Sequence, residues 1–584
     1  MMPAVRPRDL YAQRLIERRD AAAALRKREL TISFVRVAVA VIAVILLFVR
    51  AWLALIPVAL FIALAIVHER IIRARKRLES GAAFYERGIA RIDGTWAGRG
   101  DRGDEFADDH HPYAADFDLF GNASLFELIS LAVTRSGRTR LANWLKSPSM
   151  DVSEIRARQS AVSELRENVD LREDLATDAV TVTLDEWASM PRIEITPMER
   201  VASIVLPLIA MPIVVLTIPA LFALWSFPIW PLIAISAVIG VVTRTMKPRV
   251  EQIIAGIERA EPALALLAGM LERLERERFA CERLTQLQSR IDHAHVEIER
   301  LRKRVALLDA RRNQFFMPIA ALLMWTPNVA FAIERWRAEH GRSVIDWIDV
   351  VAEFEALASL ASFAFEHPSF AMPEVTERAP LFDAHELGHP LIPDDRRISN
   401  DLRLDDTLRL LIVSGSNMSG KSTMLRSAGI AAVLAMSGAP VCAKSLTISP
   451  MAVGASIRIH DSLQENASRF YAEILRIRQV LEMSQRGPLL FLLDEMLAGT
   501  NSHDRRIGAD AIVRALVERG AVGLVSTHDL ALAQIADELA PKAANVHFED
   551  HLEHGNVVFD YRMRPGVVTK SNALALMRSV GIDV

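Results

Sequence analysis

The chain has 584 residues, too many for one hydrophobic core, so three or four structural units are expected. A net charge of −3 excludes a global basic field for nucleic acid, and two distant cysteines, Cys281 and Cys442, exclude a disulfide scaffold and fit a reducing compartment. A mean hydropathy of +0.20 beside 24% charged residues predicts polar domains joined to a few very apolar segments.

The first apolar segment runs from Thr31 to Val67 and carries only two charges, Arg36 and Arg50. A bilayer core needs about 20 helical residues, so the segment predicts two short spans with a tight turn near Arg50. A signal peptide is not expected, because the run begins late and no small-residue cleavage site interrupts it. Basic residues lie outside it on both sides: Arg26, Lys27, Arg28, Arg70, Arg73, Arg75, Lys76 and Arg77.

The stretch 101–116 (DRGDEFADDHHPYAAD) is acidic and contains His110 and His111. A metal site is one interpretation, but spaced partner ligands are missing, so a polar linker is favoured. Apolar residues at helical spacing follow, which predicts packed amphipathic helices.

The second apolar segment, Val201–Thr243, has no charged residue and fits two spans broken around SFPIWP. Basic residues again flank it: Arg200, Arg244, Lys247 and Arg249. The positive-inside rule then places both termini and the middle domain in the cytoplasm. Buried helices of a large soluble core are the alternative interpretation of both segments.

Two further stretches are predicted to be helical. Residues 249–312 are charged, with apolar residues at three- and four-residue steps, which predicts a solvated arm of coiled-coil character. The run Phe315–Ile333 is long enough to span a membrane, but it contains Pro318 and Pro327 and is favoured as a buried core helix.

From about residue 380, strand-like runs alternate with helical stretches, which predicts an α/β domain with a mostly parallel sheet. GSNMSGKS, residues 415–422, follows the run RLLIVS, opens a helix and matches the pattern of a phosphate-binding loop. In such a loop, backbone amides and a helix N-terminus hold phosphate. Lys421 is expected to reach the β- and γ-phosphates, and the Ser422 hydroxyl to bind Mg²⁺.

Two more motifs follow in the order expected for ATP hydrolysis. LLFLLDEMLAGTNSHD ends a strand in Asp494, expected to hold Mg²⁺ through water, and Glu495, expected to polarise the attacking water. LVSTHD places His528 beyond another strand, where it can sense the γ-phosphate or orient water. Ser468, before a helical stretch, is either a simple N-cap or a residue that contacts the nucleotide of a second subunit.

These residues carry a family resemblance. NMSGKST, DEMLAGTNSHD and STHDL resemble motifs of the MutS proteins, the mismatch-repair ATPases of the ABC superfamily, and Ser468, Phe470 and Glu473 fit the family signature S-x-F-x-x-E. His389 and Pro390, Asn400 and Asp401, and YRMRPGVVTKS also fit. SLFELISLAVTRSGRTRLANWLKSPSMDVSEIRARQSAVSEL is similar to the start of the MutS core. The resemblance covers residues 118–165 and about 336 to the last residue.

The expected fold is multidomain. The resemblance implies an α/β P-loop ATPase domain of the MutS domain V type with all-α core and lever helices, and the apolar segments add two transmembrane helical hairpins. It implies ATP and Mg²⁺ as cofactors, a homodimer with composite sites, and DNA as a partner. The expected catalytic residues are Lys421, Glu495 and His528, and the expected Mg²⁺ ligands are Ser422 and Asp494. The residues expected to contact ATP are Gly415, Asn417, Met418, Ser419, Gly420, Lys421, Ser422, Thr423 and, in trans, Ser468.

The departures from the family matter as well. MutS proteins that find mismatches begin with a recognition domain bearing F-x-E and a connector, whereas this chain begins with a membrane hairpin. FYE occurs at Phe84–Glu86, but no globular domain surrounds it, and we interpret it as coincidental. No nuclease module is expected after the ATPase domain. The chain thus resembles a membrane-spanning, truncated branch of the family, to which mismatch recognition does not carry over directly.

The expected domain order follows from these segments. It is an N-terminal part with the first hairpin (1–78, spans about 31–67), a linker (79–116), the first part of the core (117–195), the second hairpin (196–248, spans about 201–243), a helical arm (249–314), the second part of the core (315–375) and the ATPase domain (376–584).

Two functions from different classes are compatible with the sequence. The first is a MutS-type ATPase anchored in the bacterial inner membrane, with its ATPase domain in the cytoplasm, that grips DNA through Arg-rich stretches such as RLERERFACERL and RLRKRVALLDARR. The second is ATP-driven membrane remodelling, signalling or transport that does not act on DNA. An exporter is disfavoured because the L-S-G-G-Q signature is absent.

Overall fold

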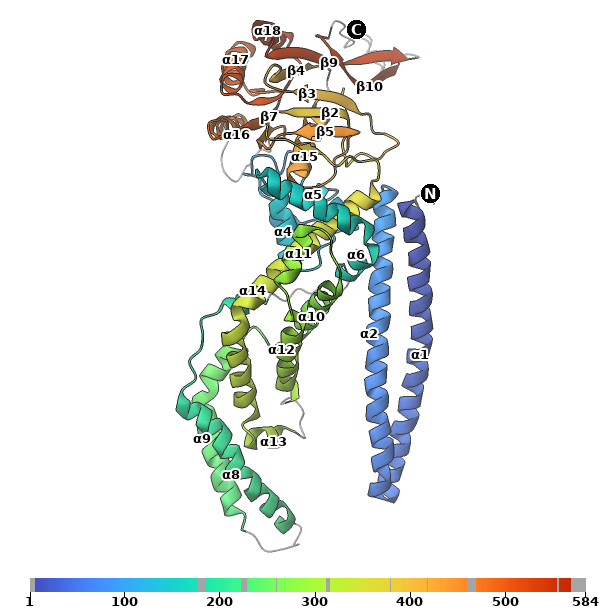
Figure 1. The fold of residues 1–584 in the computed structure, drawn as a ribbon, viewed down its shortest axis with the longest axis vertical. Coiled ribbons are helices and arrows are strands. Elements are labelled where there is room, and N and C mark those ends of the chain that lie inside the picture. Colours follow the sequence, from blue (N-terminus) through green and yellow to red (C-terminus); the bar gives the residue numbers. More distant parts are fainter. Residues whose placement is uncertain are drawn as a thin grey trace. The chain divides into compact units, whose positions relative to one another are not determined.

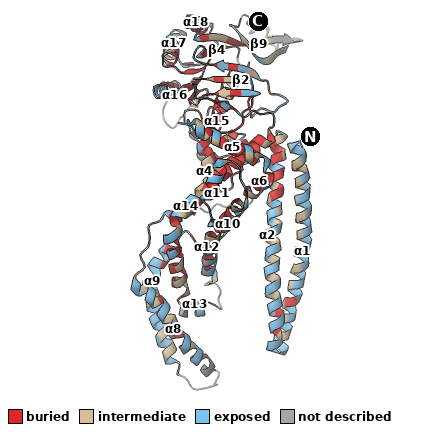
Figure 2. Cartoon of the chain, in the orientation of Figure 1, coloured by how far each residue is buried: buried red, intermediate tan, exposed pale blue. Residues whose placement is uncertain are grey.

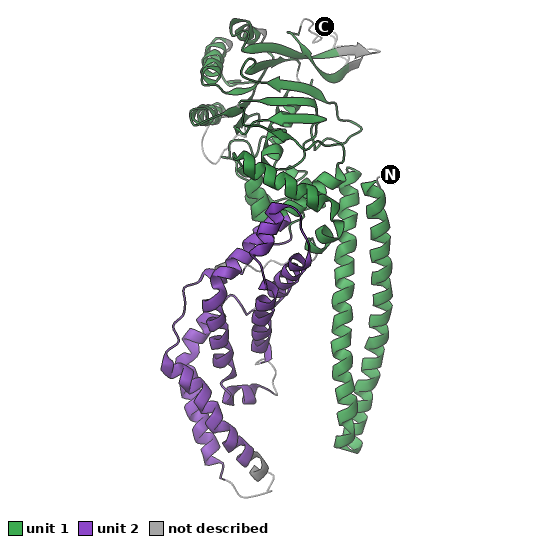
Figure 3. Cartoon of the chain, viewed as in Figure 1, with its two compact units in different colours: residues 1–132, 138–177, 356–584 green, residues 133–137, 178–355 purple. Residues whose placement is uncertain are grey.

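The computed structural model describes residues 6–176, 184–221, 228–258, 260–310, 316–378, 380–416, 418–458, 469–553 and 556–568. Two compact units are distinguished in Figure 3. Unit 1 comprises residues 1–132, 138–177 and 356–584, and unit 2 comprises residues 133–137 and 178–355. The long helix α14 (Trp325–Glu366) contributes residues to both units.

Unit 1 begins with a helical hairpin, α1 (Pro7–Val49) and α2 (Leu55–Ile92), joined through a short 3-10 turn that follows Arg50. Each helix contains a stretch long and apolar enough to cross a membrane. Large apolar side chains such as Phe34, Phe48 and Ile56 are exposed along these stretches, where Figure 2 shows mostly exposed residues.

The polar ends of the hairpin are packed into unit 1. Helix α2 continues to Ile92, so residues 79–92, expected in a linker, are helical. The cause is an aromatic cluster: Phe84 and Tyr85 are fully buried against Tyr11 of α1, with ring centroids 5.8 and 5.4 Å away. Phe84 therefore presents no exposed ring to a ligand, which supports the interpretation of FYE as coincidental.

The C-terminal part of unit 1 contains two sheets (Figure 1). In the six-stranded sheet, five neighbouring strands are parallel, and the edge strand β10 pairs antiparallel with β9. Its strands, in spatial order, are β10 (Asn556–Pro565), β9 (Ala543–Glu553), β4 (Leu410–Ser414), β8 (Val522–Thr527), β7 (Leu489–Asp494) and β6 (Ala452–Ser456). The predicted strands RLLIVS, LLFLLD and VGLVST are three of the four interior strands, because their continuous apolar runs suit burial on both faces.

A smaller, mixed sheet has the order β1 (Glu374–Val375), β5 (Ser445–Ile448), β2 (Phe382–Leu387) and β3 (Asn400–Leu404). The helices of the C-terminal part are α15 (Lys421–Ser437), α16 (Arg469–Met483), α17 (Ser502–Glu518) and α18 (Leu530–Glu538).

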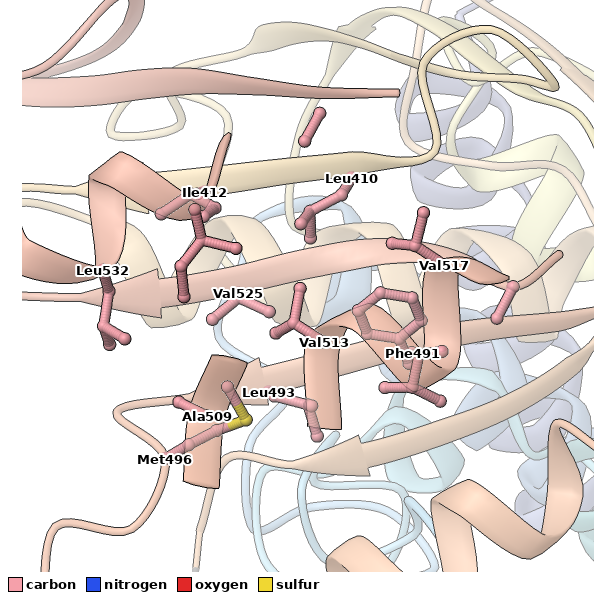
Figure 4. Packing of buried hydrophobic residues seen from close by; sticks show 14 of the residues in the cluster. Leu410, Ile412, Phe491, Leu493, Met496, Ala509, Val513, Val517, Val525 and Leu532 are labelled. Carbon is pink, nitrogen blue, oxygen red and sulfur yellow. The ribbon is translucent and has the colours of Figure 1, made fainter. Parts of the chain in front are cut away.

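One apolar core joins the six-stranded sheet to its helices. Phe491 and Leu493 of β7 and Val525 of β8 pack with Val513 of α17 and Leu532 of α18 (Figure 4). All five side chains are buried. This core fixes the carboxyl ends of β4, β7 and β8, from which the candidate site is built.

Unit 1 also contains short helices of the predicted core, α3 (Leu125–Ile129), α5 (Val152–Glu167) and α6 (Val169–Leu175), while α4 (Arg135–Lys146) has residues in both units. Phe117, which precedes α3, is fully buried where α15 carries Gly429. A Cβ atom at Gly429 would lie 2.0 Å from the Phe117 ring, so the contact requires glycine.

Unit 2 is helical. Its elements are α7 (Asp185–Ser189), α8 (Pro197–Leu221), α9 (Trp230–Ile254), α10 (Glu261–Arg276), α11 (Glu282–Ser289), α12 (Ala294–Asp309), α13 (Met317–Leu322) and the first part of α14. Pro197–Thr217 and Trp230–Ile254 are two further stretches long and apolar enough to cross a membrane.

The region predicted as a continuous arm, 249–312, is divided into separate helices. The backbone breaks at Gly256 and again at His293, both with positive φ. One apolar face of α10 and of α12 is buried: Leu264, Leu271 and Leu301 are fully buried rather than solvated. The same periodicity that suggests a coiled coil here serves packing within one helical bundle.

The third apolar run is interrupted as well. Helix α13 ends at Leu322, and α14 begins at Trp325 after Met324, which has a φ of 45°. Val329 and Ile333 are buried, whereas Met317 and Ile319 of α13 are exposed. The run is therefore a buried helix only in its second half, and it is not among the candidate spans of the described residues.

Candidate functional site

The candidate site begins at the loop between β4 and α15. Gly415 has a φ of 149° and Gly420 a φ of 108°, and a Cβ atom at Gly415 would lie 2.8 Å from Ser419 Oγ. Among the residues that the structure describes, no side chain caps the N-terminus of α15, so the backbone N–H groups of its first turn are open to a ligand. The Ser419 hydroxyl oxygen is buried and has no hydrogen-bond partner among the described residues. The loop is thus rich in unused donors, as an anion site requires.

Lys421 is the first residue of α15, and its side chain is only 5% exposed. Its Nζ donates hydrogen bonds to the carbonyl oxygens of Gly415 (2.7 Å) and Ser416 (3.0 Å). Burial lowers the pKa of Lys421, and the nearby carboxylates of Glu495 and Asp494 act in the opposite direction. A cation is therefore held inside the loop with little competition from water.

Two carboxylates and a histidine lie at the ends of β7 and β8. Glu495 Oε1 is 3.4 Å from His528 Nδ1 and 3.9 Å from Lys421 Nζ. Ser526 of β8 bonds to both acidic residues: its hydroxyl donates to Asp494 Oδ1, and its carbonyl oxygen accepts from the Glu495 N–H at 3.2 Å. Glu495 has a φ of 47°, a backbone conformation that is uncommon for a residue other than glycine.

Helix α16 holds the segment that follows Glu495. Glu473 is buried, and its carboxylate accepts a hydrogen bond from the Leu497 N–H. Phe470 lies against Gly499, where an added Cβ atom would be 2.9 Å from Phe470 Cβ. Two residues of the S-x-F-x-x-E signature thus act locally, by fixing the loop that carries the glutamate.

A cavity of about 1290 Å³ opens beside these groups. Its lining includes the polar side chains of Lys421, Ser422, Asp494 and Glu495. The lining also includes apolar and aromatic side chains, among them Leu387, Ile392, Ile398, Phe548, Phe559 and Tyr561, together with His389. Burial lowers the pKa of His389 to about 4, so this imidazole is neutral at pH 7.

The sequence-predicted residues converge on this cavity with few exceptions. Met418, Gly420, Lys421, Ser422, Thr423, Asp494 and Glu495 line it. Gly415 and Ser419 belong to the loop, and His528 reaches the site through its contact with Glu495. Asn417 and Ser468 lie outside the described residues.

Two residues lie in stretches that the sequence singled out, but the sequence assigned them no role. Ser526 is the first residue of STHDL, and only the structure shows its contacts with Asp494 and Glu495. Tyr561 is oriented by Asn400, whose side chain donates to the Tyr561 carbonyl oxygen (3.0 Å) and accepts from the Met563 N–H (2.7 Å). Sequence alone could not pair positions so far apart.

The interpretation of His110 and His111 as a metal site receives no support. Within the described ranges, no group of three or more metal-binding side chains occurs. His111 instead contacts the Lys146 carbonyl oxygen at 2.9 Å and accepts from the Ala114 N–H.

Several arginines of the Arg-rich stretches already have carboxylate partners. In α10, Arg273 pairs with Glu277 and Arg276 with Glu272. In α12 the same holds for Arg300, with Glu297, and for Arg302, with Glu299 and Glu261. These ion pairs favour the interpretation of a solvated, internally neutralised surface.

The sequence matches two family descriptions, MutS domain V over residues 411–583 and MutS domain III over residues 114–483. It is 34% identical over 243 residues to "Endonuclease MutS2" of Thermus thermophilus, which covers 40% of this chain and 30% of the relative. It is 32% identical over 224 residues to "DNA mismatch repair protein MutS" of an Exiguobacterium species, covering 38% of this chain and 26% of that protein.

The alignments thus span less than a third of each of these relatives. The domain III match alone, however, covers more than half of this chain and continues through the second apolar hairpin. With the mixed α/β sheets and the large helical part described above, the chain belongs to the MutS family.

Proposed function

We propose that this chain is a membrane-anchored ATPase of the MutS type that works as a dimer and acts on DNA. The observation that carries the proposal is that Lys421, Asp494 and Glu495 line one cavity and that His528 contacts Glu495 beside it, all from the ends of three neighbouring strands. This combination of a buried cation, a metal-binding carboxylate and a base suits hydrolysis of a nucleoside triphosphate.

The residues present fit ATP and Mg²⁺. Donors for phosphate oxygens are Lys421, the backbone N–H groups of the first turn of α15 and the Ser419 hydroxyl, which has no partner in the part of the chain that the structure describes. Ser422 and Asp494 line the same cavity and supply oxygen ligands of the kind that Mg²⁺ prefers. When bound, Mg²⁺ would neutralise charge on the β- and γ-phosphates. The aromatic side chains of the lining are suited to a planar base.

The roles of the side chains follow from their contacts. Lys421 exchanges the loop carbonyls for phosphate oxygens without crossing solvent. Glu495 accepts a proton from the attacking water, and His528 orients the same carboxylate from 3.4 Å. Ser526 fixes the distance between the metal-binding and the proton-accepting carboxylate, because it bonds to both residues.

Dimerisation is proposed from the family signature. Ser468 would contact the nucleotide held by Lys421 of the partner, so that each site is completed by a second copy. Phe470 and Glu473 connect α16 to the loop after Glu495. A nucleotide held by the partner and contacted by Ser468 would thereby influence the position of Glu495.

DNA is proposed as the ligand because both relatives carry names that refer to DNA repair or to nuclease activity. The arginines of α10 and α12 that pair with carboxylates do not favour these helices as the DNA-binding surface. Membrane anchoring is proposed from the four apolar helices and their flanking basic residues. The location proposed is the bacterial inner membrane, with the ATPase domain in the cytoplasm.

The test is the ATPase rate of the full chain in nanodiscs, measured with and without duplex DNA, matched and mismatched, at two salt concentrations. Stimulation by DNA that weakens with salt supports the proposal, since phosphate contacts release counterions. Hydrolysis without any response to DNA would contradict the DNA part and favour remodelling, signalling or transport at the membrane. An absence of hydrolysis under all conditions would contradict the ATPase itself.

A further inference from the structure

A second cavity lies in unit 2, away from the site described above. It has a volume of about 970 Å³ and lies between α9 on one side and α13 with the start of α14 on the other. On α9 the lining extends from Ser236 to Ile254, which corresponds to ~27 Å of helix. The cavity is therefore an elongated groove rather than a compact pocket.

The chemistry of this groove changes along its length. Ser236, Ile239 and Gly240 lie within the uncharged part of α9, where the candidate span is. Arg244 and Lys247 follow one and two turns later.

Across the groove, Met317, Pro318, Ala321 and Leu322 supply an apolar wall, and Met317 of α13 is exposed. The apolar section of the groove is thus followed directly by a basic section, Arg244 and Lys247, which we call the basic collar.

The charges that face the groove can be counted among its lining residues. They are two cations, Arg244 and Lys247, and one carboxylate, Glu251. Glu251 is 3.6 Å from Lys247. Arg244 has no carboxylate partner among the described residues and is exposed. The collar therefore keeps a net positive charge where the apolar helix ends.

The geometry points to a binding site for an anionic phospholipid, with the acyl chain along Ser236–Gly240 and the phosphate headgroup at Arg244 and Lys247. This site rests on the proposed membrane insertion of α8 and α9. Basic pockets between apolar helices at the cytoplasmic side recognise such headgroups, and a soluble anion would use only the collar. The ligand would couple the lipid composition of the membrane to α13 and hence to α14.

The groove offers two independent variants that should not disturb folding. A Cβ atom at Gly240 meets nothing within 4 Å, so Gly240→Leu fills the apolar section without a clash and improves helix propensity. Arg244→Gln/Lys247→Gln removes the collar at exposed positions. The matched controls are Gly269→Leu, where a Cβ atom also meets open space, and Arg200→Gln, a basic residue near the start of α8 that does not line the groove.

The experiment measures binding of fluorescent phosphatidylglycerol and phosphatidylcholine to the full chain in a mild non-ionic detergent. We expect phosphatidylglycerol to bind preferentially, and the double variant to weaken its binding by about 30-fold, which corresponds to roughly fivefold for each basic residue. Gly240→Leu should weaken both lipids, and the two controls should leave binding unchanged. Millimolar inorganic phosphate should compete poorly.

Four results would overturn the inference: equal binding of both lipids, a loss in Arg200→Gln as large as in the double variant, full competition by inorganic phosphate, or unchanged binding in Gly240→Leu, which would place the ligand elsewhere. Alkaline extraction of membranes separates this failure from that of the proposed function. A chain released by alkali was never inserted, whereas an inserted chain without phosphatidylglycerol preference refutes the lipid site alone.

Discussion

The buried carboxyl group of Glu355 predicts that the stability of the surrounding segment depends on pH. This residue of α14 is buried, and its carboxylate accepts hydrogen bonds from the N–H groups of Val133 (2.8 Å) and Thr134 (3.0 Å) and from the Thr134 hydroxyl. It therefore secures the segment that leads into α4. Burial raises the pKa of Glu355 from 4.5 to about 7, although these hydrogen bonds favour the ionised form.

The sign follows from proton binding. Between pH 4.5 and about 7, the folded state retains a proton on Glu355 that the unfolded state releases. Stability is therefore greatest at the acidic end of this window and falls as the pH rises through it. One pKa unit corresponds to about 1.4 kcal/mol, so raising the pH across the whole window lowers the free energy of unfolding by about 3 kcal/mol. Glu355→Gln, which resembles the protonated form, removes this dependence.

The assay is hydrogen exchange of peptides covering residues 131–146 in the full chain, corrected for intrinsic exchange rates, from pH 5 to pH 8. The opening free energy of the wild type, minus that of Glu355→Gln, should fall by about 3 kcal/mol over this range. A difference that stays constant, or that rises with pH, would show that Glu355 is ionised throughout and would refute the reasoning.

Three further predictions concern packing and the site. Gly429→Ala places a methyl group in the ring of Phe117 and should destabilise the protein by about 3 kcal/mol, seen as a lower thermal midpoint. Glu366→Ala leaves Arg91 buried without the carboxylate that it contacts at 2.6 Å, which should cost about 3 to 5 kcal/mol by the same measurement. Ser526→Ala removes the hydroxyl shared by the two acidic residues of the site and should lower kcat about tenfold with little change in ATP affinity.

Each of these predictions has a result that would contradict it. Gly269→Ala is the control for the first, because its Cβ atom meets open space, and an equal effect of both variants would remove Phe117 from the argument. An unchanged thermal midpoint in Glu366→Ala would mean that water solvates the Arg91 guanidinium in place of the carboxylate. An unchanged kcat in Ser526→Ala would show that the backbone alone positions the two carboxylates.

Local signals explain what the sequence could predict of the ATPase part. Continuous apolar runs identify β4, β7 and β8, and the spacing of Gly415 and Gly420 identifies the loop before Lys421. Both glycines have positive φ in the structure, as that loop requires. Because parallel strands end at one edge of a sheet, residues that follow them meet in space. Lys421, Asp494, Glu495 and His528 could therefore be grouped without knowing any long-range contact.

The remainder depends on pairings between distant positions. Nothing near Tyr85 in the sequence shows that its hydroxyl bonds to Glu173, and nothing near Asn400 shows that it orients Tyr561. Helical periodicity gave the correct element type for 249–312, but it could not distinguish a free arm from a bundle, because both bury one apolar stripe.

The most direct test of the central claim uses Glu495→Gln in the full chain, with ATP binding and phosphate release measured on the same preparation. Glu495 lies between Lys421 and His528, so its amide variant should retain nucleotide and lose turnover by at least about 100-fold. Retained binding without hydrolysis would establish Glu495 as the base of an ATPase site. Turnover equal to that of the wild type would contradict the account.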